Sequence, residues 1–245
     1  MKLKAKLRSI ANRGLKPFGL ELIRRSPNRI EMDAALHRVA QHGFPIGTVV
    51  DIGAAKGTWS VMALRALPQA KVLGIEPLKE REKDLLKLKK ENLRFDFDLC
   101  VAGEKDGETA KLNVSVDHLG GSTVEGVGGE SREVPVRSLD GMLTEKQLPG
   151  PFLLKFDTHG YELPILKGAE KILEQTQVIV MECYNFRFVP QALLFQEMCE
   201  HMDNLGFRPY DIANPSLRKH DRALWQIDLF FARKDHLLFS VDSYE

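Results

Sequence analysis

The strongest chemical signal in the sequence is a strand that ends in a carboxylate and turns into a helix between two glycines. An apolar run ends at Asp51, Gly53 follows two residues later, and Gly57 stands at the start of the next helical segment. A glycine in such a turn lets a ligand approach the backbone closely, and the first turn of the helix offers unpaired N–H groups. Twenty-five residues after Asp51, the second apolar run ends in Glu76. A carboxylate at that place can accept hydrogen bonds from both hydroxyls of a ribose.

This arrangement suits a nucleoside cofactor, and its charges distinguish two of them. A dinucleotide site uses Gly-x-Gly-x-x-Gly so that the backbone can close on a pyrophosphate, whereas this chain has Gly-x-x-x-Gly with Lys56 between the glycines. Asp51, shortly before the turn, would repel a pyrophosphate but attract the ammonium and sulfonium groups of S-adenosylmethionine. We therefore predict a site for S-adenosylmethionine that includes Asp51, Gly53, Ala54, Gly57, Glu76 and Pro77.

A second group of chemically competent residues follows another buried strand. The run 152–156 is followed by Asp157, and His159 and Glu162 lie in the turn and the first helical turn that come next. In open α/β sheets the ligand crevice lies outside the carboxyl ends of the strands. Acidic side chains fall at four such ends, and a solvated surface does not explain their common position: Asp51, Glu76, Asp157 and Glu182.

Transfer of a methyl group to a hydroxyl would need a base within hydrogen-bond reach of the proton. A histidine such as His159 has an ordinary pKa of about 6.5 and is matched to neutral pH, whereas an aspartate such as Asp157 starts at about 3.9. We predict that His159 is the base, that Asp157 orients it, and that Glu162 completes the catalytic set. In the alternative interpretation, Asp157 and Glu162 fix the turn and cap the helix while His159 points to solvent.

A divalent metal is the main mechanistic alternative. Asp157, His159 and Glu182 carry suitable donors, and a metal-bound hydroxyl ionises more easily, but their spacing along the chain is not that of a ligand motif. We therefore predict a site without a metal. Side chains near the same strand ends are candidates for binding the methyl acceptor: Lys155, Glu182, Tyr184 and Asn185.

The spacing of apolar residues predicts strands that alternate with helices around these motifs. Strands are predicted over 48–52, 71–75, 95–101, 152–157, 178–183, 207–212 and 226–232, and helices over 57–67, 79–91 and 189–205. This alternation predicts βαβ units and a doubly wound, mostly parallel sheet. Between 104 and 150 the pattern changes, because two short strands, 111–116 and 133–136, flank a glycine-rich loop. A lid over the substrate and a simple hairpin excursion both explain that loop.

Composition places the chain among soluble globular proteins. Its 245 residues are 43% apolar and 28% charged, which is near the globular average and sufficient for a large core. The sequence has no run of 18 apolar residues and no secretory signal, and its three cysteines lack a Cys-x-x-Cys spacing. We therefore expect a cytoplasmic protein.

The net charge of +1 conceals an uneven distribution. Residues 1–29 hold nine basic side chains and one acidic side chain, so this stretch is near +8 and the rest of the chain near −7. Apolar residues recur in it at spacings of three and four, which predicts a basic amphipathic helix. Such a helix suits the anionic inner face of a membrane or an acidic partner, and a packed first helix kept soluble by its lysines remains the other interpretation. Basic charge without interleaved aromatic residues does not favour nucleic acid.

Six motifs follow one another in a distinctive order. They are Val-Asp-Ile-Gly at 50–53, Gly-Ile-Glu-Pro at 74–77, Arg-Ser-Leu-Asp at 137–140, the block from Lys155 to Ala169, Val-Ile-Val-Met-Glu at 178–182 and Trp-Gln-Ile-Asp-Leu-Phe-Phe at 225–231. In this order they resemble the FkbM-type S-adenosylmethionine-dependent methyltransferases over about residues 45–235. The resemblance implies a class I methyltransferase fold, Rossmann-like, with a seven-stranded sheet whose last strand is antiparallel.

The resemblance also implies roles for particular residues. Asp51, Gly53 and Gly57 would line the methionine part of the cofactor, and the segment from Asp98 to Ala102 would approach its adenine. Many members carry an acidic residue where this chain has His159, so a carboxylate cannot be the base at this position. The same difference weakens the inference of a metal-binding role from those acidic members to this chain.

Together these observations predict two regions and one activity. We expect a basic helical extension over 1–44 and a methyltransferase domain over 45–240. The predicted activity is O-methylation of a small hydroxylated acceptor, a saccharide, a glycolipid precursor or another natural product. The alternative is a non-catalytic module of the same fold that binds a nucleoside, or a partner through its basic N-terminal helix.

Overall fold

The computed structural model describes residues 11, 14, 15, 17, 30–114, 121, 122 and 130–243. The basic stretch 1–29 lies almost entirely outside these residues, and so does most of the glycine-rich loop. The predictions made for the two segments therefore stay predictions.

Seven strands of the described chain form the main sheet. They are β1 (Thr48–Ile52), β2 (Lys71–Ile75), β3 (Phe95–Asp98), β8 (Phe152–Phe156), β9 (Thr176–Tyr184), β10 (Phe207–Leu217) and β11 (Leu224–Arg233). In space their order is β10-β11-β9-β8-β1-β2-β3, and β11 runs antiparallel to both of its neighbours while the other pairs are parallel. The expected doubly wound sheet of seven strands with an antiparallel last strand is confirmed.

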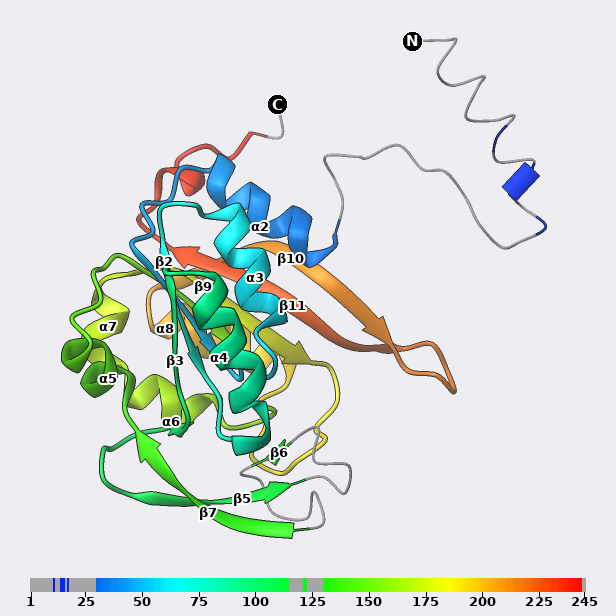
Figure 1. The fold of residues 1–245 in the computed structure, drawn as a ribbon. Helices are drawn as coiled ribbons and strands as arrows, with labels where there is room; N and C mark the ends of the chain where they lie inside the picture. The colour runs from blue at the N-terminus through cyan, green and yellow to red at the C-terminus, as the bar shows by residue number, and fades with distance from the viewer. Residues whose placement is uncertain are drawn as a thin grey trace.

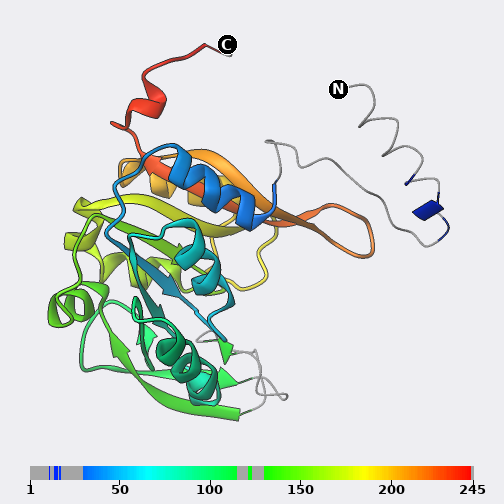
Figure 2. The same ribbon diagram turned by 45° about the horizontal axis from the view of Figure 1, so that its top comes forward.

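Helices cover both faces of this sheet, which makes a three-layered molecule (Figures 1 and 2). One face carries α2 (Met32–Gln41), α3 (Thr58–Ala66) and α4 (Glu82–Glu91), preceded by the short 3-10 helix η2 (Lys79–Arg81). The other carries α5 (Leu139–Glu145), α6 (Glu162–Lys167), α7 (Glu170–Glu174) and α8 (Phe195–Asn204). Successive side chains of a strand point to opposite faces of the sheet. Val49 therefore packs with α2, α3 and α4 on one face, and Val50 packs with α5 to α8 on the other. Both faces are apolar, as the continuous Val, Ile and Leu runs require.

Helix α2 belongs to the folded core although it lies within the range assigned to the N-terminal extension. Ala35, Leu36 and Val39 are fully buried, together with residues of α3 and the sheet. Arg38 donates to Asp211 of β10 at 2.6 Å. The helix therefore covers one face of the sheet and is tied to its edge strand β10.

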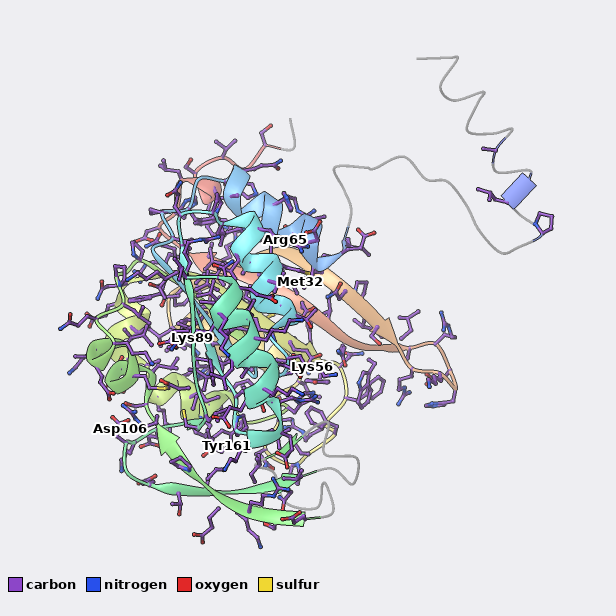
Figure 3. All side chains as sticks on the ribbon, in the orientation of Figure 1. Met32, Lys56, Arg65, Lys89, Asp106 and Tyr161 are labelled. Atoms are coloured by element: carbon purple, nitrogen blue, oxygen red, sulfur yellow. The ribbon has the colours of Figure 1, made fainter. Side chains whose placement is uncertain are left out.

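A second, small sheet lies beside the carboxyl ends of the main strands (Figure 1). It contains β4 (Val101–Ala102), β5 (Thr109–Val114), β6 (Gly121–Ser122) and β7 (Glu130–Arg137), in the order β4-β7-β5-β6. Leu112 and Val114 of β5 pack against Leu78, which follows β2. In Figure 3, Asp106 and Tyr161 lie on the side of the main sheet that faces this small sheet.

Four predicted elements differ from the structure by three residues or more at one end. The strand predicted over 207–212 continues to Leu217, and the strand predicted over 133–136 begins at Glu130. The strand predicted over 95–101 ends at Asp98, and Val101 begins β4 in the small sheet. The helix predicted over 189–205 begins only at Phe195. The residues before it form turns because Leu194 makes a bridge with Tyr184 of β9, and Arg187 donates to the carbonyl oxygen of Ala192 at 2.7 Å.

Candidate active site

A pocket opens at the carboxyl ends of β1, β2 and β8, where the small sheet covers the main one. Both core strands and surface turns contribute to it. Its lining consists of Ile52, Gly53, Ala55, Ile75, Glu76, Pro77, Leu78, Arg81, Cys100, Val101, Ala102, Leu112, Asp157, Thr158, His159, Tyr161 and Ile165. Predicted cofactor residues and predicted catalytic residues therefore share one cavity.

The turn after β1 is held against the turn after β8, backbone against backbone. Gly53 has φ +82°, and a Cβ on it would lie 2.3 Å from the carbonyl oxygen of Asp157. The amide of Asp157 in turn donates to Ile52 at 3.0 Å. Only glycine allows this approach. Gly57 begins α3 and Ala54 is buried, and neither belongs to the pocket lining, whereas the intervening Ala55 does.

Glu76 links the turn after β1 to the turn after β2. Its Oε2 accepts from the amide of Ala55 at 2.7 Å, and its Oε1 accepts from the amide of Leu78 at 2.9 Å. Burial raises the pKa of Glu76, and the two amide donors oppose that rise. A carboxylate has about four lone-pair sites, so both oxygens can still accept a bond from a ribose hydroxyl.

Asp51 is fully buried beneath the pocket and is not part of its lining. Its Oδ2 accepts from the Ser60 hydroxyl at 2.7 Å, and its Oδ1 lies 3.6 Å from the ammonium of Lys155. Burial raises the pKa of Asp51, and Lys155 opposes the effect. These contacts support an indirect role for Asp51, through Lys155, rather than direct contact with a cofactor.

Lys155 links Asp51 to the turn after β8. Its ammonium donates to Oδ2 of Asp157 at 2.8 Å, and the side chain is almost completely buried. Burial alone would lower the pKa of Lys155, but Asp51 and Asp157 together raise it. The same contact lowers the pKa of Asp157 although burial opposes this. Lys155 is therefore a charged structural partner, and the predicted contact with an acceptor remains a proposal.

His159 lies between two carboxylates from different strands. Its Nε2 is 3.8 Å from Oδ1 of Asp157 and 3.8 Å from Oε2 of Glu182, and the ring is about half exposed. Glu182 accepts hydrogen bonds from the hydroxyl of Tyr184 and the side-chain amide of Gln226. His159 also has φ +52°, a conformation that non-glycine residues adopt at a cost and that is often found at functional sites.

Glu162 fixes the turn between β8 and α6. Its Oε1 accepts from the amide of Gly160 at 2.8 Å and from the hydroxyl of Thr158 at 3.1 Å. The side chain is buried. These contacts favour a positioning role for Glu162 over proton transfer.

The remaining predicted residues divide between the pocket and its surroundings. Pro77 and Ala102 belong to the lining. Asp98 lies outside the lining, and its Oδ1 is 2.9 Å from the ammonium of Lys146. Asn185 is exposed beyond the end of β9. Leu112 was missed, because it comes from the small sheet and has no local chemical signal.

Asp228 is the acidic residue that sequence reasoning missed. It lies directly opposite Glu182 in the antiparallel pair of β11 and β9, so the two side chains share a face of the sheet. Asn214 donates to it at 3.0 Å. Burial and the charge of Glu182 raise the pKa of Asp228 to about 7. Its place in the motif Trp-Gln-Ile-Asp was the one available signal.

Comparison with known proteins identifies the family. The model of the methyltransferase FkbM domain matches residues 51–209, which is more than half of the chain. The chain belongs to the FkbM family of S-adenosylmethionine-dependent methyltransferases. The match includes Glu76, Asp157, His159 and Glu182 and ends in β10.

Solved structures with a similar fold are distant from this FkbM-family chain. The methyltransferase FkbM of Methylobacillus flagellatus KT has 19% identity and a TM-score of 0.48 over 76% of this chain and 43% of its own. This chain thus corresponds to less than half of that protein. A putative RNA methyltransferase of Pyrococcus horikoshii has 16% identity, a TM-score of 0.45, and coverage of 82% and 83%. The magnesium protoporphyrin IX methyltransferase of Synechocystis PCC 6803, with bound S-adenosylmethionine, has 12% identity, a TM-score of 0.46, and coverage of 82% and 76%. No curated protein sequence gives a significant match.

The donor atoms of the catalytic group also have the spacing of a metal site. One ligand atom each from Asp157, His159 and Glu182 lies within 4.8 Å of the others, although their separation along the chain gave no hint of this. Lys155 already compensates Asp157, however, and Tyr184 and Gln226 already donate to Glu182. Asp157 and Glu182 thus already have donors within the chain, and the prediction of a site without a metal stays a prediction.

In the part of the chain that the structure describes, no helix is long and apolar enough to cross a membrane. The longest of the helices that bracket the site, α4 and α8, have ten residues each, whereas a spanning helix needs about 20.

The raised pKa of Asp228 predicts a pH dependence of stability. The folded protein holds a proton on this carboxyl up to a pH of about 7, whereas the unfolded chain releases it near its ordinary value of 3.8. Because the folded state binds the extra proton, this residue makes stability fall as pH rises between these values. We expect Asp228→Asn to become more stable relative to the unchanged protein over this interval, and the difference to level off above it.

Urea unfolding of both proteins at a series of pH values measures this difference. Asp235→Asn is a matched control, because Asp235 is exposed after β11 and makes only a surface ion pair with Arg233. A stability difference for Asp228→Asn that does not change with pH would contradict the assignment.

Proposed function

We propose that this protein transfers a methyl group from S-adenosylmethionine to a hydroxyl oxygen of a small acceptor, a saccharide, a glycolipid precursor or another natural product. One observation carries the proposal. The same pocket has Glu76, suited to a ribose, and His159, suited to accept a hydroxyl proton, with Asp157 beside it. A site that only binds a nucleoside would not require His159 and Asp157.

The pocket offers complementary groups for each part of the cofactor. Glu76 would accept bonds from the ribose hydroxyls, and Gly53 leaves room for the methionine part to approach the turn after β1. Ala102, at the end of β4, would lie against the adenine, with Leu112 of the small sheet above it. When bound, S-adenosylmethionine supplies an electrophilic methyl group on a cationic sulfur, which a site rich in carboxylates stabilises.

His159 would act on the acceptor. The imidazole of His159 would accept the proton of the acceptor hydroxyl as that oxygen takes the methyl group, which the cofactor held at Glu76 and Gly53 would supply. The resulting cation would lie between the carboxylates of Asp157 and Glu182, each 3.8 Å away. General-base catalysis of this kind contributes roughly 10²–10⁴-fold, and orientation of the reacting atoms contributes on the order of 7–11 kcal/mol in favourable cases.

Loss of the Glu76 carboxylate tests cofactor binding. We expect calorimetry to show S-adenosylmethionine binding to the unchanged protein and an affinity at least about 10-fold lower for Glu76→Gln, because hydrogen bonds to a charged group contribute about 1.5–3 kcal/mol. Glu91→Gln, an exposed change on α4, should bind normally. Absence of binding to the unchanged protein at millimolar ligand would remove the proposed function.

Removal of the imidazole tests catalysis. We expect His159→Ala to lower kcat about 10²–10⁴-fold while calorimetry shows unchanged affinity for S-adenosylmethionine. Turnover is followed with labelled donor and a cell extract, and the linkage of the transferred methyl group is identified in the product. His37→Ala on α2 is the control, because that histidine is exposed and does not line the pocket.

Two further outcomes bear on the mechanism. Full activity of His159→Ala would exclude it as the base. Turnover in excess chelator should equal turnover without it, and a loss that added divalent ions restore would instead assign a metal to Asp157, His159 and Glu182.

The basic stretch 1–29 adds a proposal about location. Its charge near +8 favours contact with an anionic membrane, which would bring the enzyme to a lipid-linked acceptor. We expect the full chain to co-sediment with vesicles that contain phosphatidylserine, and this co-sedimentation to fall when residues 1–29 are deleted or salt is raised. Equal co-sedimentation with and without the segment would contradict the proposal.

A further inference from the structure

Four aromatic rings form a continuous group where β9 ends and β11 begins, which we call the aromatic wall: Tyr184, Phe186, Phe188 and Trp225. Phe186 and Trp225 are stacked, with centroids 5.8 Å apart and planes 15° apart. Tyr184 lies 4.3 Å from Phe188 and 6.0 Å from Trp225. The backbone amide of Asn185 donates to the carbonyl oxygen of Trp225 at 2.9 Å, which holds the two segments of the wall together.

The aromatic wall begins at the catalytic histidine and leads away from the cofactor pocket. The rings of His159 and Tyr184 are 6.4 Å apart, and the hydroxyl of Tyr184 donates to Glu182. His159 lines the pocket that contains Glu76, whereas the four rings of the wall do not. A molecule lying on the wall would therefore reach His159 from outside the pocket that contains Glu76.

Packing of the core does not account for these rings. Tyr184 is buried, but Phe186, Phe188 and Trp225 are only half-buried, and Phe186 and Trp225 belong to none of the core clusters of the described residues. Single exposed apolar side chains are ordinary, whereas a contiguous group beside a reactive residue marks a binding surface. Arg218, in the loop after β10, pairs with Asp221 and lies over the ring of Phe186, 3.6 Å from its centroid. One face of Phe186 is therefore covered, and Trp225, stacked against Phe186, is the ring left to meet a ligand.

We propose that the aromatic wall binds the acceptor as a saccharide ring, with its C–H face on the indole of Trp225 and one hydroxyl directed at His159. This inference rests on the proposed function and narrows its acceptor. A sugar ring has an apolar face and a hydroxylated edge, and the site presents the matching pair. The indole face would meet the apolar face of the sugar, and the exposed side chain of Asn185, next to Phe186 in the chain, would be available to its hydroxyls.

Tryptophan fluorescence tests the wall directly. The chain has two tryptophans, and the difference between the unchanged protein and Trp225→Phe isolates the emission of Trp225, because Trp59 is buried on α3. The probes are methyl glucoside, methyl galactoside and methyl mannoside, with methyl 4-hydroxybenzoate as a flat phenolic probe. We expect at least one glycoside to give a saturable shift of the Trp225 emission and the phenol to give none.

Kinetics with the glycoside that gives the shift supply a second readout. Trp225→Ala should raise KM about 2- to 12-fold, since an aromatic contact contributes about 0.5–1.5 kcal/mol, with affinity for S-adenosylmethionine unchanged. Phe239→Ala is the matched control, because Phe239 is also half-buried and has Arg208 over its ring, at 4.8 Å, away from the site.

The outcomes separate this inference from the proposed function. A shift caused by the phenol alone, or no shift with any probe, would overturn the saccharide assignment even if S-adenosylmethionine binds and an acceptor in an extract is methylated. If S-adenosylmethionine fails to bind but a glycoside shifts Trp225, the wall is a saccharide site and the methyltransferase proposal fails.

Discussion

The buried ammonium of Lys155 lies between two carboxylates from the ends of neighbouring strands, and the site is arranged around it. Asp51 lies 3.6 Å away at the end of β1 and Asp157 lies 2.8 Å away after β8. Taking charges out of water is costly, and removal of one partner of a buried pair costs roughly 3–5 kcal/mol. The three residues therefore depend on one another, and the position of Asp157 follows from a charge balance beneath the pocket floor.

The same region is held by contacts between backbones. Gly53 allows the turn after β1 to touch the carbonyl of Asp157. Gly168 allows the end of α6 to touch the loop between β4 and β5 of the small sheet, because a Cβ on Gly168 would lie 2.0 Å from the carbonyl oxygen of Gly103. These contacts place Glu76 and His159 on facing sides of one pocket. They also explain why glycines recur in the motifs around Asp51 and before Ala169, since any side chain would separate the elements.

Much of the fold could be predicted because apolar periodicity is a local property. The strands at 48–52 and 71–75 match the structure in both bounds, since each is a short apolar run followed by a turn. Errors arose where a contact distant in sequence decided the outcome. Because Leu194 forms a bridge with Tyr184, α8 begins later in the chain than predicted. Val101 pairs with β7 and therefore belongs to the small sheet. No pattern within either segment contains that information.

The sequence by itself determined which residues could do chemistry and at which end of the sheet they lie. Parallel strands that end in Glu76, Asp157 and Glu182 must bring these groups to one edge, because the carboxyl ends of such strands meet there. Only the tertiary structure decided which of them face the pocket. Asp51 is buried beside Lys155, and Glu162 accepts hydrogen bonds from its own turn. Asp228 lies opposite Glu182 in an antiparallel pair of strands. The division has a physical reason, because residue type and order are local, whereas burial and charge pairing depend on neighbours that only folding brings together.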